Sequence, residues 1–155
     1  MNKEYLERYV AFLNKAFLIP SPLSVVFDIS NGTTGEIIET LMKERKEIRA
    51  QILNTVPDGN FPTHGPDPLA RGVLEKLGEK VVETGGDIGI IFDADGDRVF
   101  FSDDKGRHIP GDVVTALILE NFKGPVVLDV RAGYTARDFL HNHKKEIIDA
   151  RVGHY

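Results

Sequence analysis

Hydrophobic residues follow two different spacings along this chain. Between residues 3 and 17 they recur every three to four positions, which is the period of an amphipathic helix. Residues 25–27 instead form a short apolar run after two prolines, as expected for a buried strand. The same reasoning predicts further helices over residues 36–42, 69–84, 110–123 and 133–142. It also predicts strands over 48–53, over 126–130 and from 147 onward, and a hairpin over 88–109.

Strands and helices therefore alternate through most of the sequence. The hairpin must be antiparallel, whereas strands joined by helical crossovers favour parallel neighbours. We expect an α/β fold, and specifically a three-layer α/β/α sandwich with a mixed β-sheet. At 155 residues the chain is long enough for one ordinary domain and part of a second.

Composition narrows the class of protein. The chain is 41% hydrophobic and 28% charged, and no apolar run approaches the roughly 20 residues that span a bilayer. A net charge of -5 argues against nucleic-acid binding, which needs clustered Lys and Arg. The absence of cysteine excludes disulfides, Cys-ligated zinc and thiol catalysis, and it fits a cytoplasmic protein. We expect neither a nucleic-acid partner nor a membrane partner.

The densest candidate chemistry is the acidic loop, residues 93–98, which reads DADGDR between two apolar runs. Held a few Å apart, carboxylates repel by roughly 3 kcal/mol per pair at an effective dielectric near 20, and a cation relieves this. Asp93, Asp95 and Asp97 alternate, and residues two apart in an extended chain point to the same side. They can therefore converge on one ion. Oxygen-only ligands favour a hard divalent cation, and so small a set suits Mg²⁺.

Other interpretations of the acidic loop stay open. Many Asp-rich turns only face water. An EF-hand fits poorly, because Arg98 and Asp104 stand where its loop needs Gly and Glu. A small aspartyl phosphatase with Asp93 as nucleophile is an alternative, although that class usually carries Thr or Val in place of Asp97. A non-catalytic magnesium-binding or interaction module is another.

Two further segments have their own patterns. Residues 30–35 (SNGTTG) superficially resemble a phosphate cradle but lack the P-loop and dinucleotide motifs, so we interpret them as a structural strand-to-helix turn. Four prolines exclude regular structure from residues 57–68, and a long rigid loop is more often functional than idle. The histidines below lack metal-ligand spacing and are interpreted as loop or surface residues: His64, His108, His141 and His143.

Several segments together resemble the α-D-phosphohexomutases, and their phosphomannomutase/phosphoglucomutase branch most closely. They are VFD at 26–28 with Asn31-Gly32, PDGNFP and PDPL within 57–69, and the DADGDR loop, in the family's order. The resemblance covers essentially the whole chain. It implies that residues 1–123 are a metal-binding domain like the second of the family's four. Residues 124–155 would begin the next, sugar-binding domain, which is truncated.

The resemblance also implies roles in the acidic loop. Asp93, Asp95 and Asp97 correspond to the three protein ligands of Mg²⁺, whose remaining place takes an oxygen of a phosphoserine. Arg98 would lie by the transferring phosphate as a catalytic residue, where a fixed positive charge stabilises developing negative charge. No phosphoserine loop, with its Ser-His-Asn-Pro signature, is present in this chain. We therefore expect the isolated chain to be an inactive fragment that binds Mg²⁺ weakly.

Substrate contacts are implied near the end of the chain. Gly153 and His154 resemble the Gly-His of the family's substrate loop, although Tyr155 stands where many members have Lys. Arg131 falls where members often carry a basic active-site residue, and a surface arginine is the alternative interpretation.

The implied reaction interconverts hexose 6-phosphate and hexose 1-phosphate, of mannose or glucose, through a phosphoserine enzyme and a bisphosphate intermediate. The implied partners are the hexose phosphate substrate and the remaining mutase domains. Without those domains, exposed apolar surface would cause weak self-association.

Overall fold

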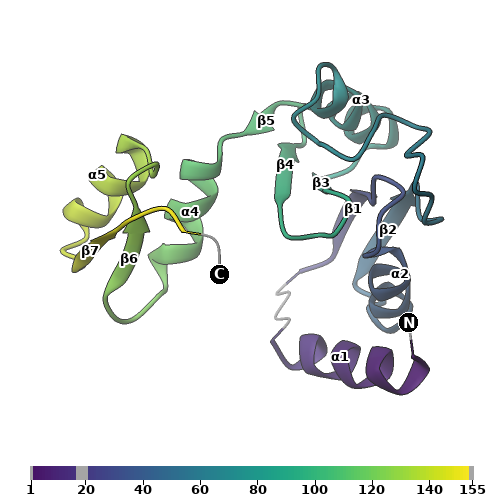
Figure 1. The fold of residues 1–155 in the computed structure, drawn as a ribbon, viewed down its shortest axis with the longest axis horizontal. Coiled ribbons are helices and arrows are strands. Elements are labelled where there is room, and N and C mark those ends of the chain that lie inside the picture. Colours follow the sequence, from purple (N-terminus) through teal and green to yellow (C-terminus); the bar gives the residue numbers. More distant parts are fainter. Residues whose placement is uncertain (1, 17–20, 154–155) are drawn as a thin grey trace. The chain divides into compact units, whose positions relative to one another are not determined.

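The computed structural model describes residues 2–16 and 21–153, so Phe17 and His154 lie outside the described residues. The chain divides into two compact units, Met1–His108 and Ile109–Tyr155 (Figure 1). This division differs from the expected boundary between residues 123 and 124. Helix α4 (Gly111–Glu120) belongs to the second unit, because its Leu119 packs on that unit's core. The assignment of the chain to two domains of a mutase stays a prediction.

A five-stranded sheet in the order β2-β1-β3-β4-β5 lies in the first unit, apart from the last residue of β5. Its strands are β1 (Leu23–Asp28), β2 (Ile48–Leu53), β3 (Ile88–Phe92), β4 (Val99–Asp103) and β5 (His108–Ile109). β1 pairs in parallel with both β2 and β3, whereas β4 runs antiparallel to β3. The sheet is therefore mixed, and the hairpin is antiparallel, as the sequence predicted.

Helices cover both faces of this sheet. Alternate residues of β1 point to opposite faces, so Val25 and Phe27 enter one core and Val26 enters the other. The first core receives α1 (Lys3–Ala16) and α2 (Gly35–Glu44), and the second receives α3 (Val73–Thr84). This confirms the three-layer α/β/α sandwich.

The parallel strands bring three loops to the same edge of the sheet. Asp28, the last residue of β1, pairs with Leu53 at the end of β2 and with Ile91 near the end of β3. The segments that follow, residues 29–34, 54–72 and 93–98, therefore start side by side (Figure 1). Ligand sites of parallel α/β sheets usually lie at this carboxyl edge.

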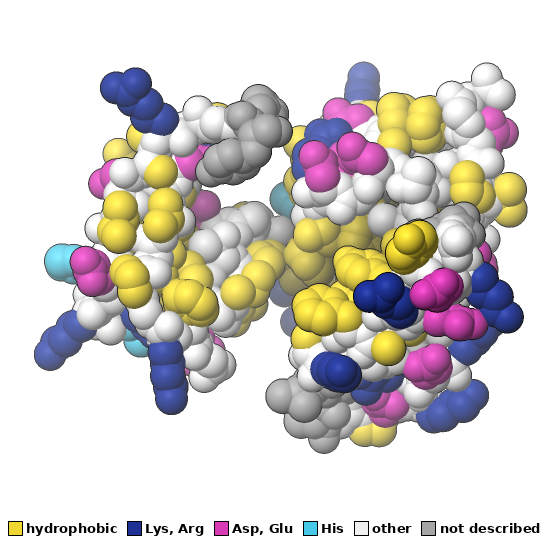
Figure 2. Space-filling view, turned by 60° about the horizontal axis from the view of Figure 1, so that its bottom comes forward, with side chains coloured by type: hydrophobic (Ala, Val, Ile, Leu, Met, Phe, Trp, Pro, Cys, Tyr) yellow, Lys and Arg dark blue, Asp and Glu magenta, His cyan; other side chains and the backbone are white. Residues whose placement is uncertain are grey.

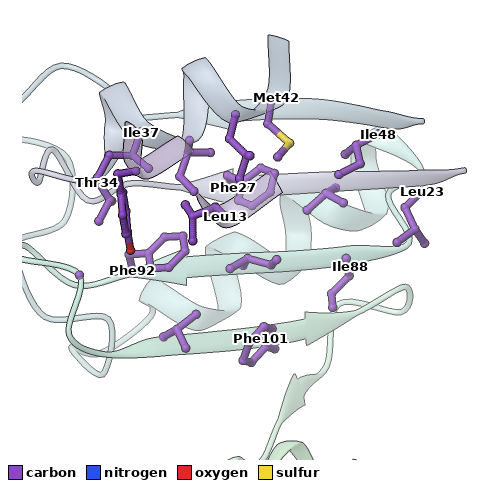
Figure 3. A pocket seen from close by; sticks show the side chains of 17 residues that line it. Leu13, Leu23, Phe27, Thr34, Ile37, Met42, Ile48, Ile88, Phe92 and Phe101 are labelled. Atoms are coloured by element: carbon purple, nitrogen blue, oxygen red, sulfur yellow. The ribbon is translucent and has the colours of Figure 1, made fainter. Parts of the chain in front are cut away.

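An apolar cavity of about 520 Å³ lies on the α1 and α2 face of the sheet. Ile37 and Met42 of α2 face it from one side, and Phe92 and Phe101 of the sheet face it from the other (Figure 3). Apolar side chains are also exposed elsewhere on the surface (Figure 2). Tyr5 of α1, for example, is 62% exposed, whereas the adjacent Leu6 is buried.

The second unit is smaller and contains α4, β6 (Val126–Asp129), α5 (Tyr134–Asn142) and β7 (Ile147–Ala150). β6 and β7 form a parallel pair. Val126, Leu128 and Leu140 make its core, whereas Val127 on the opposite side of β6 is 62% exposed.

None of the helices in the described part of the chain combines the length and the apolar character that crossing a bilayer requires.

Candidate metal centre

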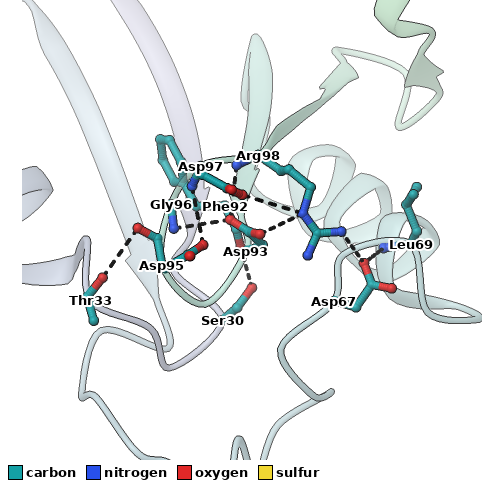
Figure 4. Close-up of polar contacts among 10 residues, drawn as sticks. All are labelled: Ser30, Thr33, Asp67, Leu69, Phe92, Asp93, Asp95, Gly96, Asp97 and Arg98. Carbon is teal, nitrogen blue, oxygen red and sulfur yellow. Dashed lines mark hydrogen bonds and ion pairs between the residues drawn. The ribbon is translucent and has the colours of Figure 1, made fainter. Parts of the chain in front are cut away.

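The acidic loop, residues 93–98, connects β3 to β4 and brings three carboxylates together (Figure 4). One oxygen each of Asp93, Asp95 and Asp97 lies within 4.8 Å of the other two. Asp93 is buried, with 2% of its surface exposed, whereas Asp95 and Asp97 are exposed. The convergence predicted from the sequence is therefore present.

Its cause differs from the predicted one. The loop is bent and not extended, so strand alternation does not align the carboxylates. Gly96 has φ 78°, in the left-handed region that favours glycine. The bend brings Asp95 and Asp97 back toward Asp93, which directly follows β3.

Asp93 is held by hydrogen bonds from Gly96 and Arg98 of the same loop. Its Oδ1 accepts the backbone N–H groups of Gly96 and Arg98, each at 3.1 Å. Its Oδ2 accepts Nε of Arg98 at 2.7 Å. Burial opposes ionisation of this carboxyl, but the backbone N–H and the guanidinium of Arg98 together hold the pKa of Asp93 below its ordinary value. Asp93 is thus ionised and fixed in place.

Arg98 connects the acidic loop to residues 57–68, which we call the proline-rich loop. Its Nε also lies 3.6 Å from Asp97 Oδ1, and its Nη1 lies 3.4 Å from Asp67 Oδ1. Asp67 accepts the backbone N–H of Leu69 as well, which fixes its carboxylate (Figure 4). The side chain of Arg98 is 51% exposed, so the guanidinium has solvent access on one side. The structure shows an ion pair between Arg98 and Asp93. The catalytic role of Arg98 stays a prediction.

The charge balance of the loop favours an additional cation. Repulsion from Asp95, followed by the hydrogen bond with Asp93, raises the pKa of Asp97 above its ordinary value. Arg98 alone therefore does not neutralise the cluster. Three carboxylates within 4.8 Å offer only oxygen ligands, which matches the preference of Mg²⁺. The residues present fit that ion.

The turn after β1 donates hydrogen bonds to the backbone around the acidic loop, a contact that was not predicted from the sequence. Ser30 Oγ donates to the carbonyl of Phe92 at 2.6 Å, and Thr33 N donates to the carbonyl of Ala94 at 2.9 Å. A Cβ at Gly32 would lie 2.3 Å from the Ala94 carbonyl oxygen, so only glycine fits there. The turn does lead from strand to helix as predicted. The Asn31-Gly32 pair was the signal that could have shown its second role.

His64 corrects one expectation. We interpreted it as a loop or surface residue; it does lie in a loop, but its side chain is only 5% exposed. Its Nε2 lies 3.1 Å from Oδ2 of Asp28, at the end of β1. The other three histidines are exposed, as expected.

The predicted substrate residues lie in the second unit or beyond the described part. Arg131 is 71% exposed in its side chain, and its Nη2 lies 2.8 Å from Asp129 Oδ2, which is the geometry of a surface ion pair. Gly153 is exposed, and His154 lies outside the described residues. Their substrate roles stay predictions.

Comparison with known proteins gives consistent matches. The family model described as phosphoglucomutase/phosphomannomutase, alpha/beta/alpha domain II, matches residues 3–106. A phosphomannomutase of Methanocaldococcus jannaschii is 32% identical over 155 residues, which cover 97% of this chain and 34% of that protein. A probable phosphoglucosamine mutase of Methanobrevibacter smithii is 36% identical over 153 residues, covering 99% of this chain and 33% of that protein.

Solved structures agree with these matches. A phosphoglucomutase/phosphomannomutase family protein from Burkholderia thailandensis superposes with a TM-score of 0.83 at 28% identity, over 96% of this chain and 33% of that one. A putative phosphomannomutase from Thermus thermophilus has a TM-score of 0.80 at 18% identity, which supports the fold alone. The chain thus spans about a third of the length of these relatives.

Proposed function

Because this chain belongs to the phosphoglucomutase/phosphomannomutase family, we propose that it is the metal-binding part of an enzyme that interconverts hexose 6-phosphate and hexose 1-phosphate. The observation that carries the proposal is the convergence of Asp93, Asp95 and Asp97 within 4.8 Å on one loop. The proposed reaction passes a phosphoryl group between a serine outside this chain and two hexose oxygens, through a hexose bisphosphate.

Asp93, Asp95 and Asp97 would hold Mg²⁺. When bound, the ion would supply neutralisation of phosphoryl charge, which is a large part of catalysis in this chemistry. The residues of the chain then have separate tasks. Asp93 is already ionised and fixed by Arg98 and by two backbone N–H groups, so it needs little reorganisation to act as a ligand. Asp95 and Asp97 are exposed and can adjust.

Arg98 is the proposed catalytic residue of the chain. Asp93 and Asp67 hold the guanidinium from two sides, while about half of the side chain stays open to solvent. A held but accessible guanidinium can donate to phosphate oxygens without first losing much rotamer freedom. Its pKa is raised, first by the hydrogen bond with Asp93, so it stays charged at any working pH.

The aspartyl phosphatase alternative gains no support from the geometry. A nucleophilic Asp93 would need a free oxygen that can reach a phosphorus atom. The side chain of Asp93 is only 3% exposed, so a phosphoryl group, which is much larger than a single ion, has little access to its oxygens.

We also propose the partners of the intact enzyme. These are a hexose phosphate, with mannose or glucose as the sugar, and the remaining mutase domains, which would contribute the serine and most sugar contacts. Arg131, Gly153 and His154 are the proposed substrate-binding residues of this chain. A cytoplasmic location is likewise proposed.

Thermal unfolding with and without Mg²⁺ tests the metal part of the proposal. An ion that binds only the folded state raises the unfolding temperature as its concentration rises. We expect this increase in the wild-type chain and its loss in Asp97→Asn. Assays with mannose 1-phosphate, glucose 1-phosphate and a generic phosphomonoester should show no turnover by this chain alone. Turnover of either sugar phosphate would mean that the chain is a complete catalyst, and phosphomonoester hydrolysis lost in Asp93→Asn would favour the phosphatase.

A further inference from the structure

Six polar residues at the carboxyl ends of β1 and β2 form one connected hydrogen-bond network. They come from the end of β1 and the turn after it, the turn after β2 and the proline-rich loop. The members are Asp28, Ser30, Asn31, Asn54, Thr63 and His64, and we call them the Asp28 network. None of them is one of the proposed metal ligands. Their arrangement therefore needs an explanation of its own.

Asp28 is the centre of this network. Its Oδ1 accepts the backbone N–H of Ser30 at 2.8 Å and Nδ2 of Asn54 at 2.9 Å. Its Oδ2 lies 3.1 Å from Nε2 of His64. With 7% of its surface exposed, Asp28 is a buried carboxylate whose oxygens are satisfied by three donors from three segments.

His64 ties the proline-rich loop to this centre. We assign the Nε2 proton to the bond with Asp28, since a carboxylate only accepts. Nδ1 is buried and has no hydrogen-bond partner among the described residues. The bond to Asp28 is therefore the polar contact that fixes the ring, 36 residues away in sequence. Thr63 adds bonds from the same loop to Asn31 and Asn54, at 3.0 and 3.1 Å.

The backbone around the network is strained. Ser30, Asn31 and Asn54 have φ of 53°, 54° and 55°, in the left-handed region that non-glycine residues rarely adopt. Such conformations persist only when surrounding contacts fix them, and they cluster at functional sites. Each of the three residues hydrogen-bonds to another network member. The network thus stabilises an uncommon backbone shape at Ser30, Asn31 and Asn54.

Two routes of polar contacts connect this part of the backbone to the proposed metal centre. Ser30, whose N–H is fixed by Asp28, donates its Oγ to the carbonyl of Phe92, the residue before Asp93. On the other side, His64 fixes the loop that presents Asp67 to Nη1 of Arg98. The first route ends beside Asp93, the buried member of the proposed ligand set, and the second ends at Arg98.

We propose that Asp28 and His64 are positioning residues for the metal centre: their buried pair locks the turn after β1 and the proline-rich loop against the acidic loop. Neither residue touches the proposed ion. The effect of the Asp28–His64 pair on metal affinity rests on the proposed function. The effect of the pair on the acidic loop itself does not depend on any metal.

The test compares His64→Phe, which keeps a ring but removes the donor, with His64→Gln, which keeps a donor near the position of Nε2. Ile48→Ala is the matched control, because Ile48 is buried at the opposite end of the sheet, where it pairs with Leu23. Hydrogen–deuterium exchange of the amides of residues 92–98 is measured without metal. Mn²⁺ titration then gives the dissociation constant of each variant, with Asp95→Asn as the control for the metal site.

We expect His64→Phe to speed exchange in residues 92–98 by about tenfold relative to Ile48→Ala. We expect it to weaken Mn²⁺ binding by about tenfold, as loss of supporting hydrogen bonds does at other metal sites, and His64→Gln to restore most of both. Equal exchange in His64→Phe and Ile48→Ala would overturn the inference. Absence of Mn²⁺ binding to the wild-type chain would defeat the proposed function, and the exchange comparison would still decide the inference. Should His64→Phe not fold, His64→Asn, with a shorter side chain, replaces it.

Discussion

Nε of Arg98 lies 2.7 Å from Oδ2 of Asp93, which pairs an exposed arginine with the most buried aspartate of the acidic loop. The same Nε lies 3.6 Å from Asp97 Oδ1. The guanidinium therefore contacts two of the three carboxylates proposed to hold the ion. It offsets part of their mutual repulsion, and it also repels any cation that joins them.

Removing the charge of Arg98 should tighten metal binding. We expect Arg98→Gln to lower the dissociation constant for Mn²⁺ by about fivefold, because a like charge next to the ion is removed. Arg107→Gln is the matched control, since Arg107 makes a similar pair with Asp103 at 2.7 Å in the turn after β4. Weaker binding in Arg98→Gln, measured by calorimetry, would mean that the arginine organises the ligands more than it repels the ion.

The stability of the metal-free chain should depend on pH in opposite ways at two aspartates. The pKa of Asp93 is lowered on folding, so its ionised carboxylate stabilises the folded state above the unfolded pKa of about 4. This stabilisation is lost as pH falls through the folded pKa. The pKa of Asp97 is raised on folding, so its protonated carboxyl stabilises the folded state below about pH 4. This stabilisation is lost as pH rises through the folded pKa.

Both effects can be measured by urea unfolding between about pH 3 and pH 7, the range over which carboxyl groups titrate. Relative to the wild type, Asp93→Asn should reduce the loss of stability on acidification. Asp97→Asn should instead gain stability relative to the wild type as pH rises. The same slope in both variants would contradict the assigned directions.

The turn after β1 should be intolerant of any side chain at Gly32. A Cβ there would lie 2.3 Å from the Ala94 carbonyl oxygen, a backbone atom that cannot rotate away. We expect Gly32→Ala to lower the free energy of unfolding by about 1–3 kcal/mol and to weaken Mn²⁺ binding, because the acidic loop must shift. Gly59→Ala is the control, since a Cβ at Gly59 meets nothing within 4 Å. Equal stability of the two variants in urea would show that the contact is not tight.

Weak self-association should appear at high concentration. Val127 on β6 and Ile118 on α4 are 62% and 68% exposed, and apolar groups of this size on a surface favour association. Light scattering should show a mass that increases with concentration in the wild type and increases less in Val127→Lys. A mass equal to that of the monomer at every concentration would contradict this prediction.

Much of the fold could be predicted because its signals are local. The helix predicted over residues 133–142 is α5 (Tyr134–Asn142), and the strand predicted over 48–53 is β2 (Ile48–Leu53). Hydrophobic spacing, prolines and glycines specify such elements within a few residues of sequence. The convergence of the three aspartates was predicted for the same reason, since all of them lie on one loop of six residues.

What could not be predicted depends on contacts between distant segments. The burial of His64 requires Asp28, and nothing near His64 in sequence indicates that partner. Helical spacing places Tyr9 on the same side of α1 as the buried Leu6, three residues earlier, yet Tyr9 is 47% exposed, because spacing gives the face of a helix and not what covers it. Helix α4 lies in the second unit, which begins at Ile109, because Leu119 of α4 packs with residues that come later in the chain.

Calorimetric titration of the chain with Mn²⁺ tests the central claim most directly. The account predicts weak binding to the wild type, loss of binding in Asp95→Asn, and unchanged binding in Asp104→Asn, which removes an exposed aspartate from the next turn of the hairpin. Asp95 is exposed, so its substitution should leave the fold intact. Binding that is equal in the wild type and in Asp95→Asn, or no binding to either, would contradict a metal centre formed by this loop.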